Sequence, residues 1–103
     1  MNISNNAAPS YPTRFETKKI TSVIENSDYE NDVYIILFRK LDGTLTQRVA
    51  SRLSFTKYEE NVRFYSSMEG TEGGYRTART NRIFSLTKVS KSQIEKLDFA
   101  GRL

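Results

Sequence analysis

The residues best suited to chemistry form a basic stretch near the C-terminal end of the chain. In this stretch, from Gly73 to Lys91, three arginines recur at every third position. A guanidinium group donates two parallel hydrogen bonds that match a phosphate, and a stripe of such groups is typical of surfaces that bind nucleic acid or a nucleotide-like anion. The candidate binding cations are Arg76, Arg79, Arg82 and Lys88.

A structural role for the same arginines is the alternative. Acids at positions 25–32, together with Glu59 and Glu60, supply carboxylates with which they can pair. Side chains alternate between the two faces of a strand, so Arg76 and Arg79 point to opposite sides unless the chain kinks. The sequence leaves both interpretations open.

Aromatic residues accompany the arginines. Unpaired bases stack on exposed aromatic rings in single-strand binders, whereas in a β-rich domain without tryptophan most aromatics are core. We expect Phe64 to lie in the core. Strand alternation places Tyr65 and Tyr75 opposite Phe64 or beside the arginines, which makes them candidate stacking residues.

The composition removes most catalytic chemistry. The chain has no histidine and no cysteine, so the usual Ser-His-Asp, Cys-His and zinc arrangements are not available. The acidic run 25–32 lacks the glycine and terminal glutamate of a calcium loop, and 70–74 lacks the Gly-Lys-Ser/Thr ending of a phosphate loop. We therefore expect no enzyme, no catalytic residue, no cofactor and no metal.

Length and charge fit one small basic domain. The chain has 103 residues and a formal net charge of +4, which favours anionic partners without requiring one. Without cysteines there are no disulfides, so we expect a cytoplasmic protein. No apolar run approaches the length of a membrane span, and we expect no membrane partner.

The elements that must position these residues are mostly strands. We expect a flexible tail over 1–13, and then one domain over 14–103. Alternating β-branched residues predict a first strand over Arg14–Asn26. The run Val33–Lys40 is apolar on both faces and predicts a central strand. Asp42-Gly43 predicts a type I′ hairpin turn, followed by a return strand with Leu45 and Val49 facing inward.

The second half of the chain continues this pattern and then changes. Leu53 and Phe55 indicate a sheet that continues around a bend. Ser92 with Glu95, or Ser90 with Gln93, forms a capping box that predicts a C-terminal helix over about 91–99. Five or six short strands and one helix predict a small, mostly-β barrel. The later strands are expected at 62–68, 75–79 and 82–89, with a kink near Thr80-Asn81.

One motif resembles a known family. The order Arg76-Thr77-Ala78-Arg79-Thr80-Asn81-Arg82-Ile83 is similar to the Arg-Thr-Phe-Arg-Leu-Asp-Arg-Ile signature of WYL-type domains. The hairpin Phe38–Thr44 resembles their opening turn, and small phage SH3-like (Sm-like) barrels share both features. The Trp-Tyr-Leu triplet is absent, and Ala78 and Asn81 depart from the signature. The resemblance implies an SH3-like barrel whose arginines contact a nucleic acid or another anion.

Two functions follow as expectations. The first is a non-enzymatic regulatory module that binds nucleic acid or a nucleotide-like anion through Arg76, Arg79 and Arg82. The second is a phage or mobile-element accessory protein, working in the host cytoplasm, that modulates a host protein through a sheet edge or the acidic loop. The oligomeric state, and the choice between DNA, RNA and nucleotide, stay open.

Overall fold

The first element of the chain is a helix, and it corrects the sequence-based prediction. The computed structural model describes residues 11–66, 73–98 and 100–102, so most of the predicted tail lies outside the described residues. Helix α1 spans Arg14–Glu25, with Thr13 and Glu16 forming a capping box at its start. The predicted strand over Arg14–Asn26 is therefore wrong. Ile20 and Ile24, four residues apart, form the buried stripe of a helix.

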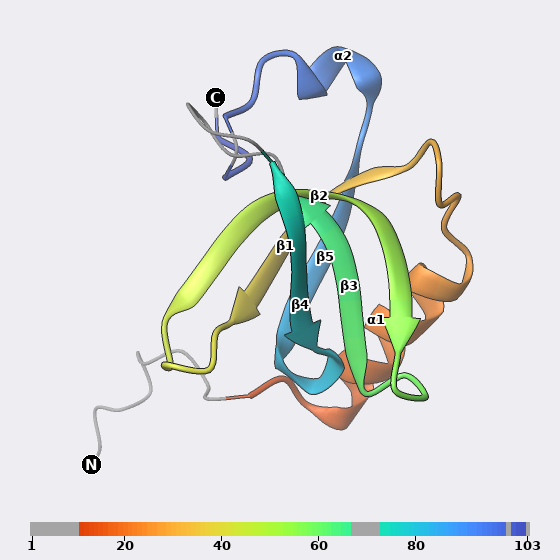
Figure 1. Cartoon of the computed structure of the whole chain (residues 1–103), viewed down its shortest axis with the longest axis vertical. Coiled ribbons are helices and arrows are strands. Elements are labelled where there is room, and N and C mark those ends of the chain that lie inside the picture. Colours follow the sequence, from red (N-terminus) through yellow and green to blue (C-terminus); the bar gives the residue numbers. More distant parts are fainter. Residues whose placement is uncertain (1–10, 67–72, 99, 103) are drawn as a thin grey trace.

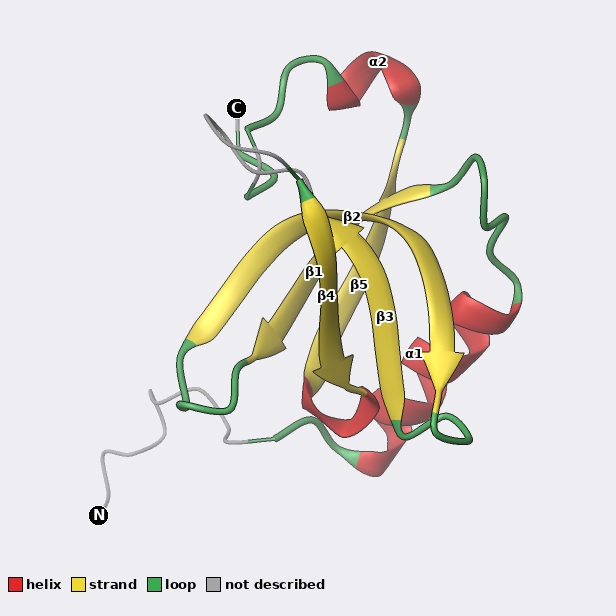
Figure 2. Cartoon of the chain, in the orientation of Figure 1, coloured by secondary structure: helices red, strands yellow, loops and turns green. Residues whose placement is uncertain are grey.

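Five antiparallel strands form a single sheet in the order β4-β3-β2-β1-β5 (Figure 1). The sheet is strongly curved, so its two edge strands β4 and β5 are joined by one short turn of 3₁₀ helix, η2 (Figure 2). This confirms the small, mostly-β fold and the kink near Thr80-Asn81. The bounds are β1 Val33–Arg39, β2 Leu45–Thr56, β3 Asn61–Ser66, β4 Gly74–Arg79, η2 Thr80–Arg82 and β5 Ile83–Val89.

The core fills the inside of this curved sheet. Phe64 and Ile36 are fully buried, and the rings of Phe38 and Phe64 meet edge to face with centroids 5.8 Å apart. Helix α1 packs against β5 and η2 and adds Ile20 and Ile24 to the same cluster. Burial of each large apolar side chain contributes about 1.5–3 kcal/mol, which is what holds the curved sheet and the helix together.

Strand β1 is central, as its apolar faces predicted. Tyr34, Ile36 and Phe38 are buried on the inner face. The C-terminal segment covers part of the outer face: a Cβ added at Gly101 would lie only 2.9 Å from Ile35. Gln47 Nε2, from neighbouring β2, donates to the Ala100 carbonyl at 2.8 Å. The second apolar face of β1 therefore packs against the end of the chain.

The hairpin between β1 and β2 differs from the predicted type I′ turn. Gly43 N–H donates to the Lys40 carbonyl at 2.9 Å, and Gly43 has φ +90° while Asp42 is not left-handed. One glycine with positive φ is typical of a longer hairpin loop with a glycine bulge. The extra residue shifts the alternation of β2, so Thr46 is buried and Leu45 is exposed, contrary to prediction.

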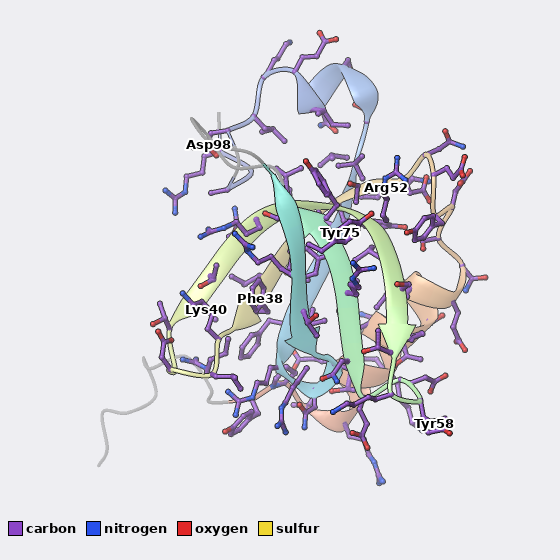
Figure 3. The ribbon with its side chains drawn as sticks, in the orientation of Figure 1. Phe38, Lys40, Arg52, Tyr58, Tyr75 and Asp98 are labelled. Carbon is purple, nitrogen blue, oxygen red and sulfur yellow. The ribbon has the colours of Figure 1, made fainter. Side chains whose placement is uncertain are left out.

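The bend in β2 lies where the sequence indicated it. The pairing register with β3 shifts between Ser51 and Ser54, and Arg52 has φ 54°. A bulge of this kind bends a strand and increases its twist. Figure 3 shows Arg52 at this bend and Tyr58, which is fully exposed, at the turn into β3.

The C-terminal helix is shorter than the predicted 91–99. Helix α2 spans only Lys91–Ile94, and its capping box uses Ser90 and Gln93 rather than the later pair. Beyond it Asp98 accepts hydrogen bonds from the backbone N–H groups of Ala100 and Arg102, both at 2.9 Å. This local turn competes with helix continuation and ends the helix early. No helix in the described residues is long and apolar enough to cross a bilayer.

Candidate functional site

The candidate site is an opening in the side of the curved sheet. Between the β1–β2 hairpin and the edge strand β4 lie two adjoining hollows of about 260 and 200 Å³. Both are lined by Phe38, Lys40 and Thr77, and Figure 3 shows Phe38 and Lys40 between the hairpin and β4. We call the described residues that line either hollow the basic mouth.

Cationic side chains dominate this lining. Lys40, Arg48 and Arg76 line the smaller hollow. Arg39, Arg79 and Arg82 join Lys40 around the larger hollow. No aspartate or glutamate is among the described residues that line either one. A modest net charge of +4 is therefore distributed unevenly, with much of the positive charge at this opening.

Strand alternation explains why two of these cations meet. On β2, Arg48 shares the inner face with buried Thr46 and Ala50. On β4, Arg76 pairs with buried Phe64 and so also stands on the inner face. In a closed barrel, side chains on the inner face would be buried in the core. Here β4 is an edge strand that does not pair with the hairpin, so the inner face is open between them. Arg48 and Arg76 therefore line the opening from opposite sides.

Arg82 is held in a defined orientation. Its Nη1 donates to the Lys40 carbonyl at 3.1 Å, and its Nη2 donates to the Tyr11 hydroxyl at 3.3 Å. The Tyr11 ring lies under the same guanidinium, with Cζ 5.1 Å from its centroid. These contacts join η2, the hairpin and the segment before α1 at the rim of the basic mouth.

Arg79 stands between the basic mouth and a second hollow. It ends β4 and also lines a polar cleft of about 630 Å³ formed by α1, the β2–β3 turn and η2. Thr80 anchors this corner, since its hydroxyl donates to the Glu59 carbonyl at 2.5 Å and its N–H donates to the Glu60 carbonyl at 2.9 Å.

The structure brings the three candidate arginines to one opening, because Arg76 lines the smaller hollow and Arg79 and Arg82 line the larger one.

The two candidate tyrosines lie elsewhere. Tyr65 and Tyr75 are directly paired across β3 and β4 on the outer face, and their rings meet edge to face at 5.5 Å. The Arg63 guanidinium stacks on Tyr75, with Cζ 3.9 Å from the ring centroid. We call Arg63, Tyr65 and Tyr75 the outer-face cluster. Figure 3 shows Tyr75 on β4, apart from Phe38 and Lys40.

Lys88 is separate from both groups. It extends from β5 and forms an ion pair with Asp32, Nζ to Oδ1 at 3.2 Å. The Asp28 backbone N–H and then Lys88 lower the pKa of Asp32. The Tyr34 hydroxyl also donates to Asp32 at 3.4 Å, and burial raises the pKa of Tyr34. Lys88 thus has a local partner and does not line the basic mouth.

Sequence reasoning missed Arg39, Lys40 and Arg48. For Arg48 the sequence signal is a polar residue pair, Thr46 and Arg48, at alternate positions of β2. The predicted alternation, with Leu45 and Val49 facing inward, implies an outer position for Arg48. The glycine-bulge turn reverses that assignment, so the turn geometry was the missing information.

Comparisons add no further identification. Neither protein-family models nor curated proteins nor solved structures gave a match to this chain. The resemblance to WYL-type domains therefore stays a prediction. Within the described ranges no group of three or more acidic, histidine or cysteine side chains is arranged to hold a metal ion.

Proposed function

We propose that this protein is a non-enzymatic binding module that takes a phosphate-bearing ligand, a nucleic acid or a nucleotide-like anion, in the basic mouth. The observation that carries the proposal is the convergence of cations from β1, β2, β4, η2 and the hairpin on two adjoining hollows. The cations come from two parts of the sequence, 39–48 and 76–82, so the concentration of charge comes from the fold and not from one basic run.

The chemistry of the lining suits phosphate. Arginine presents its donors in a rigid fork that fits two phosphate oxygens, while lysine acts as a compact point charge. A hollow with low-dielectric walls concentrates the field of its cations, which raises the attraction for anions above that of a flat surface. Phe38, at the junction of the two hollows, adds an apolar surface beside the charges.

Preorganisation supports the same function. Arg82 already donates to the Lys40 carbonyl and stacks on Tyr11. Ordering a long side chain on binding costs about 0.5–1.5 kcal/mol, and a side chain that is ordered beforehand avoids part of that cost. Binding, rather than catalysis, fits the other polar residues of the mouth, which are Thr46, Asn61 and Thr77.

The test is a fluorescence-anisotropy titration with labelled oligonucleotides at low and moderate salt. The variant Arg76→Ala/Arg79→Ala/Arg82→Ala removes three cations of the mouth. We expect it to weaken binding at low salt by at least about 30-fold, since each charge-assisted contact is worth about 1.5–3 kcal/mol and losses are only partly additive.

The matched control removes the same charge elsewhere. Lys18, Lys19 and Lys96 are exposed and do not line the basic mouth. Their triple alanine variant should bind within about 3-fold of the wild type, through the loss of net charge alone. If the wild type binds no oligonucleotide and no nucleotide at low salt, the proposal is wrong, and the host-protein interaction becomes the function to test.

A further inference from the structure

We propose that the ligand of the basic mouth is a single-stranded nucleic acid, which crosses the edge strand β4 and stacks a base on Tyr75. This inference rests on the proposed function and specifies its ligand. It joins two groups of residues that sequence reasoning could not place relative to each other, the basic mouth and the outer-face cluster.

The outer-face cluster holds one aromatic ring in a fixed place. Tyr75 is 41% exposed, although Arg63 lies 3.9 Å from its centroid and the Tyr65 ring meets it at 5.5 Å with an interplanar angle of 78°. Two neighbours on β3 thus restrain a ring that still reaches solvent. A restrained, accessible ring loses little conformational entropy when a base stacks on it.

The cluster and the basic mouth are separated by one edge strand. Arg76 faces the mouth while Tyr75, the preceding residue, stands on the outer face. Consecutive Cα atoms are about 3.8 Å apart. Thr77 links the two groups directly, because it lines both hollows of the basic mouth and pairs across the strands with Arg63 of the outer-face cluster. One ligand can therefore contact cations on one side of β4 and an aromatic ring on the other.

This arrangement selects an unpaired strand. A base inside a duplex is stacked on both faces and paired at its edge, so it cannot offer a face to Tyr75 without being flipped out. A single strand turns its bases away from its phosphates freely, and its binding sites combine a basic groove with aromatic stacking. This protein has both parts of such a site, since the cations of the basic mouth and the Tyr75 ring lie on the two sides of β4.

The experiment compares three labelled DNA probes of one length: a single strand, its duplex, and a strand whose sugars lack bases. The abasic strand carries the phosphates of the single strand without its stacking surfaces. We expect the intact single strand to bind about 10-fold tighter than the abasic strand. Stacking of one base is worth a factor of roughly 5 to 150.

Two variants locate the stacking. Tyr75→Ala should reduce the preference for the intact over the abasic strand to less than about 2-fold, while Tyr75→Phe should keep it, because stacking needs the ring and not the hydroxyl. Tyr29→Ala is the control, since Tyr29 is 42% exposed, close to the value for Tyr75, and lies in the acidic turn far from β4 in sequence.

The outcomes separate this inference from the proposed function. Equal affinity of the wild type for all three probes, combined with loss of binding in the arginine triple variant, overturns single-strand stacking and keeps the anion site. Single-strand stacking on Tyr75 is also overturned if Tyr75→Ala keeps the wild-type preference for the intact over the abasic strand. Absence of binding to every probe refutes single-strand binding, and it refutes the proposed function as well when nucleotides also fail to bind at low salt. The comparison of intact and abasic strands uses wild-type protein, so it holds even if Tyr75→Ala fails to fold.

Discussion

The basic mouth and the acidic turn over 26–32 are two charged regions that the protein uses in different ways. In the acidic turn, Asp28 accepts hydrogen bonds from the N–H groups of Glu30 and Asn31, at 3.1 and 3.2 Å. Asp32 accepts one from Asp28 N–H at 2.9 Å and pairs with Lys88. These carboxylates hold their own turn in shape.

The cations of the basic mouth have another geometry. They come from separate strands and from η2, and they converge on open hollows. Bringing like charges together costs free energy, and the fold accepts that cost at this opening. The difference teaches that charge in the sequence does not identify a site. The neighbours that the fold supplies decide whether a charge is paired with an opposite charge or lines an open hollow.

Charge reversal in the mouth should have the largest effect. Arg48→Glu/Arg76→Glu places two carboxylates on opposite sides of the smaller hollow, so a phosphate meets repulsion in place of attraction. We expect oligonucleotide affinity at low salt to fall by at least about 100-fold, which corresponds to about 2.7 kcal/mol. Anisotropy measures the affinity, and far-ultraviolet circular dichroism checks that the variant folds.

Reversal at the acidic turn provides the contrast. Lys88→Glu also replaces a cation by a carboxylate, at a single site beside Asp32. Repulsion between the two carboxylates should lower the melting temperature. Its affinity should stay within about 3-fold of the wild type, because long-range effects of single surface charges are weak at moderate salt. A loss of affinity equal to that of Arg48→Glu/Arg76→Glu would remove the distinction between the two regions.

Arg82→Lys should have an intermediate effect. Lysine keeps the charge but loses the planar fork that contacts the Lys40 carbonyl and the Tyr11 hydroxyl together. We expect affinity to weaken by about 3- to 10-fold, roughly the net value of one ordinary hydrogen bond. The same titration measures it, and Arg14→Lys, an exposed arginine at the start of α1, serves as the conservative control. Wild-type affinity in Arg82→Lys would show that charge alone matters there.

Acid should act on the turn more than on the mouth. The pKa values of Asp28 and Asp32 lie below the ordinary value of 3.8, chiefly because of the Asn31 side chain and of the Asp28 N–H, respectively. A depressed folded pKa stabilises the fold above the unfolded pKa, and that stabilisation is lost as the pH falls through the folded value.

The measurement is thermal unfolding between pH 7 and pH 2. The wild type should lose melting temperature as the pH falls toward and below about 4. Asp28→Asn/Asp32→Asn should begin lower and decline less steeply. A variant with the same decline as the wild type would show that these carboxylates do not stabilise the turn. The basic mouth has no carboxylate among its described lining residues, so no similar acid dependence is expected from it.

The strands were largely predictable because their signals are local. Val33–Lys40 is apolar on both faces, and the structure uses Tyr34, Ile36 and Phe38 for the core while the C-terminal segment contacts Ile35. The kink at Thr80 and the Ser90 capping box were also visible as local patterns. What these predictions share is that neighbours within a few residues determine them.

The failures came from patterns that fit two structures. The spacing of Ile20 and Ile24 fits both one face of a strand and the stripe of a helix, and the Thr13–Glu16 capping box decides for the helix. One extra turn residue at the hairpin reversed the two faces of β2. Arg48 was thereby missed, since its place at the mouth depends on how β2 and β4 are arranged in space and not on local sequence.

The most direct test of the account is the salt dependence of binding, measured for the wild type, for the triple variant Arg76→Ala/Arg79→Ala/Arg82→Ala and for Lys88→Ala. Each phosphate contact contributes about 0.7–0.9 to the slope of log affinity against log salt concentration. The account predicts that the triple variant loses about 2 to 3 units of slope and that Lys88→Ala loses less than about 0.5. Equal slopes for the wild type and the triple variant would contradict it.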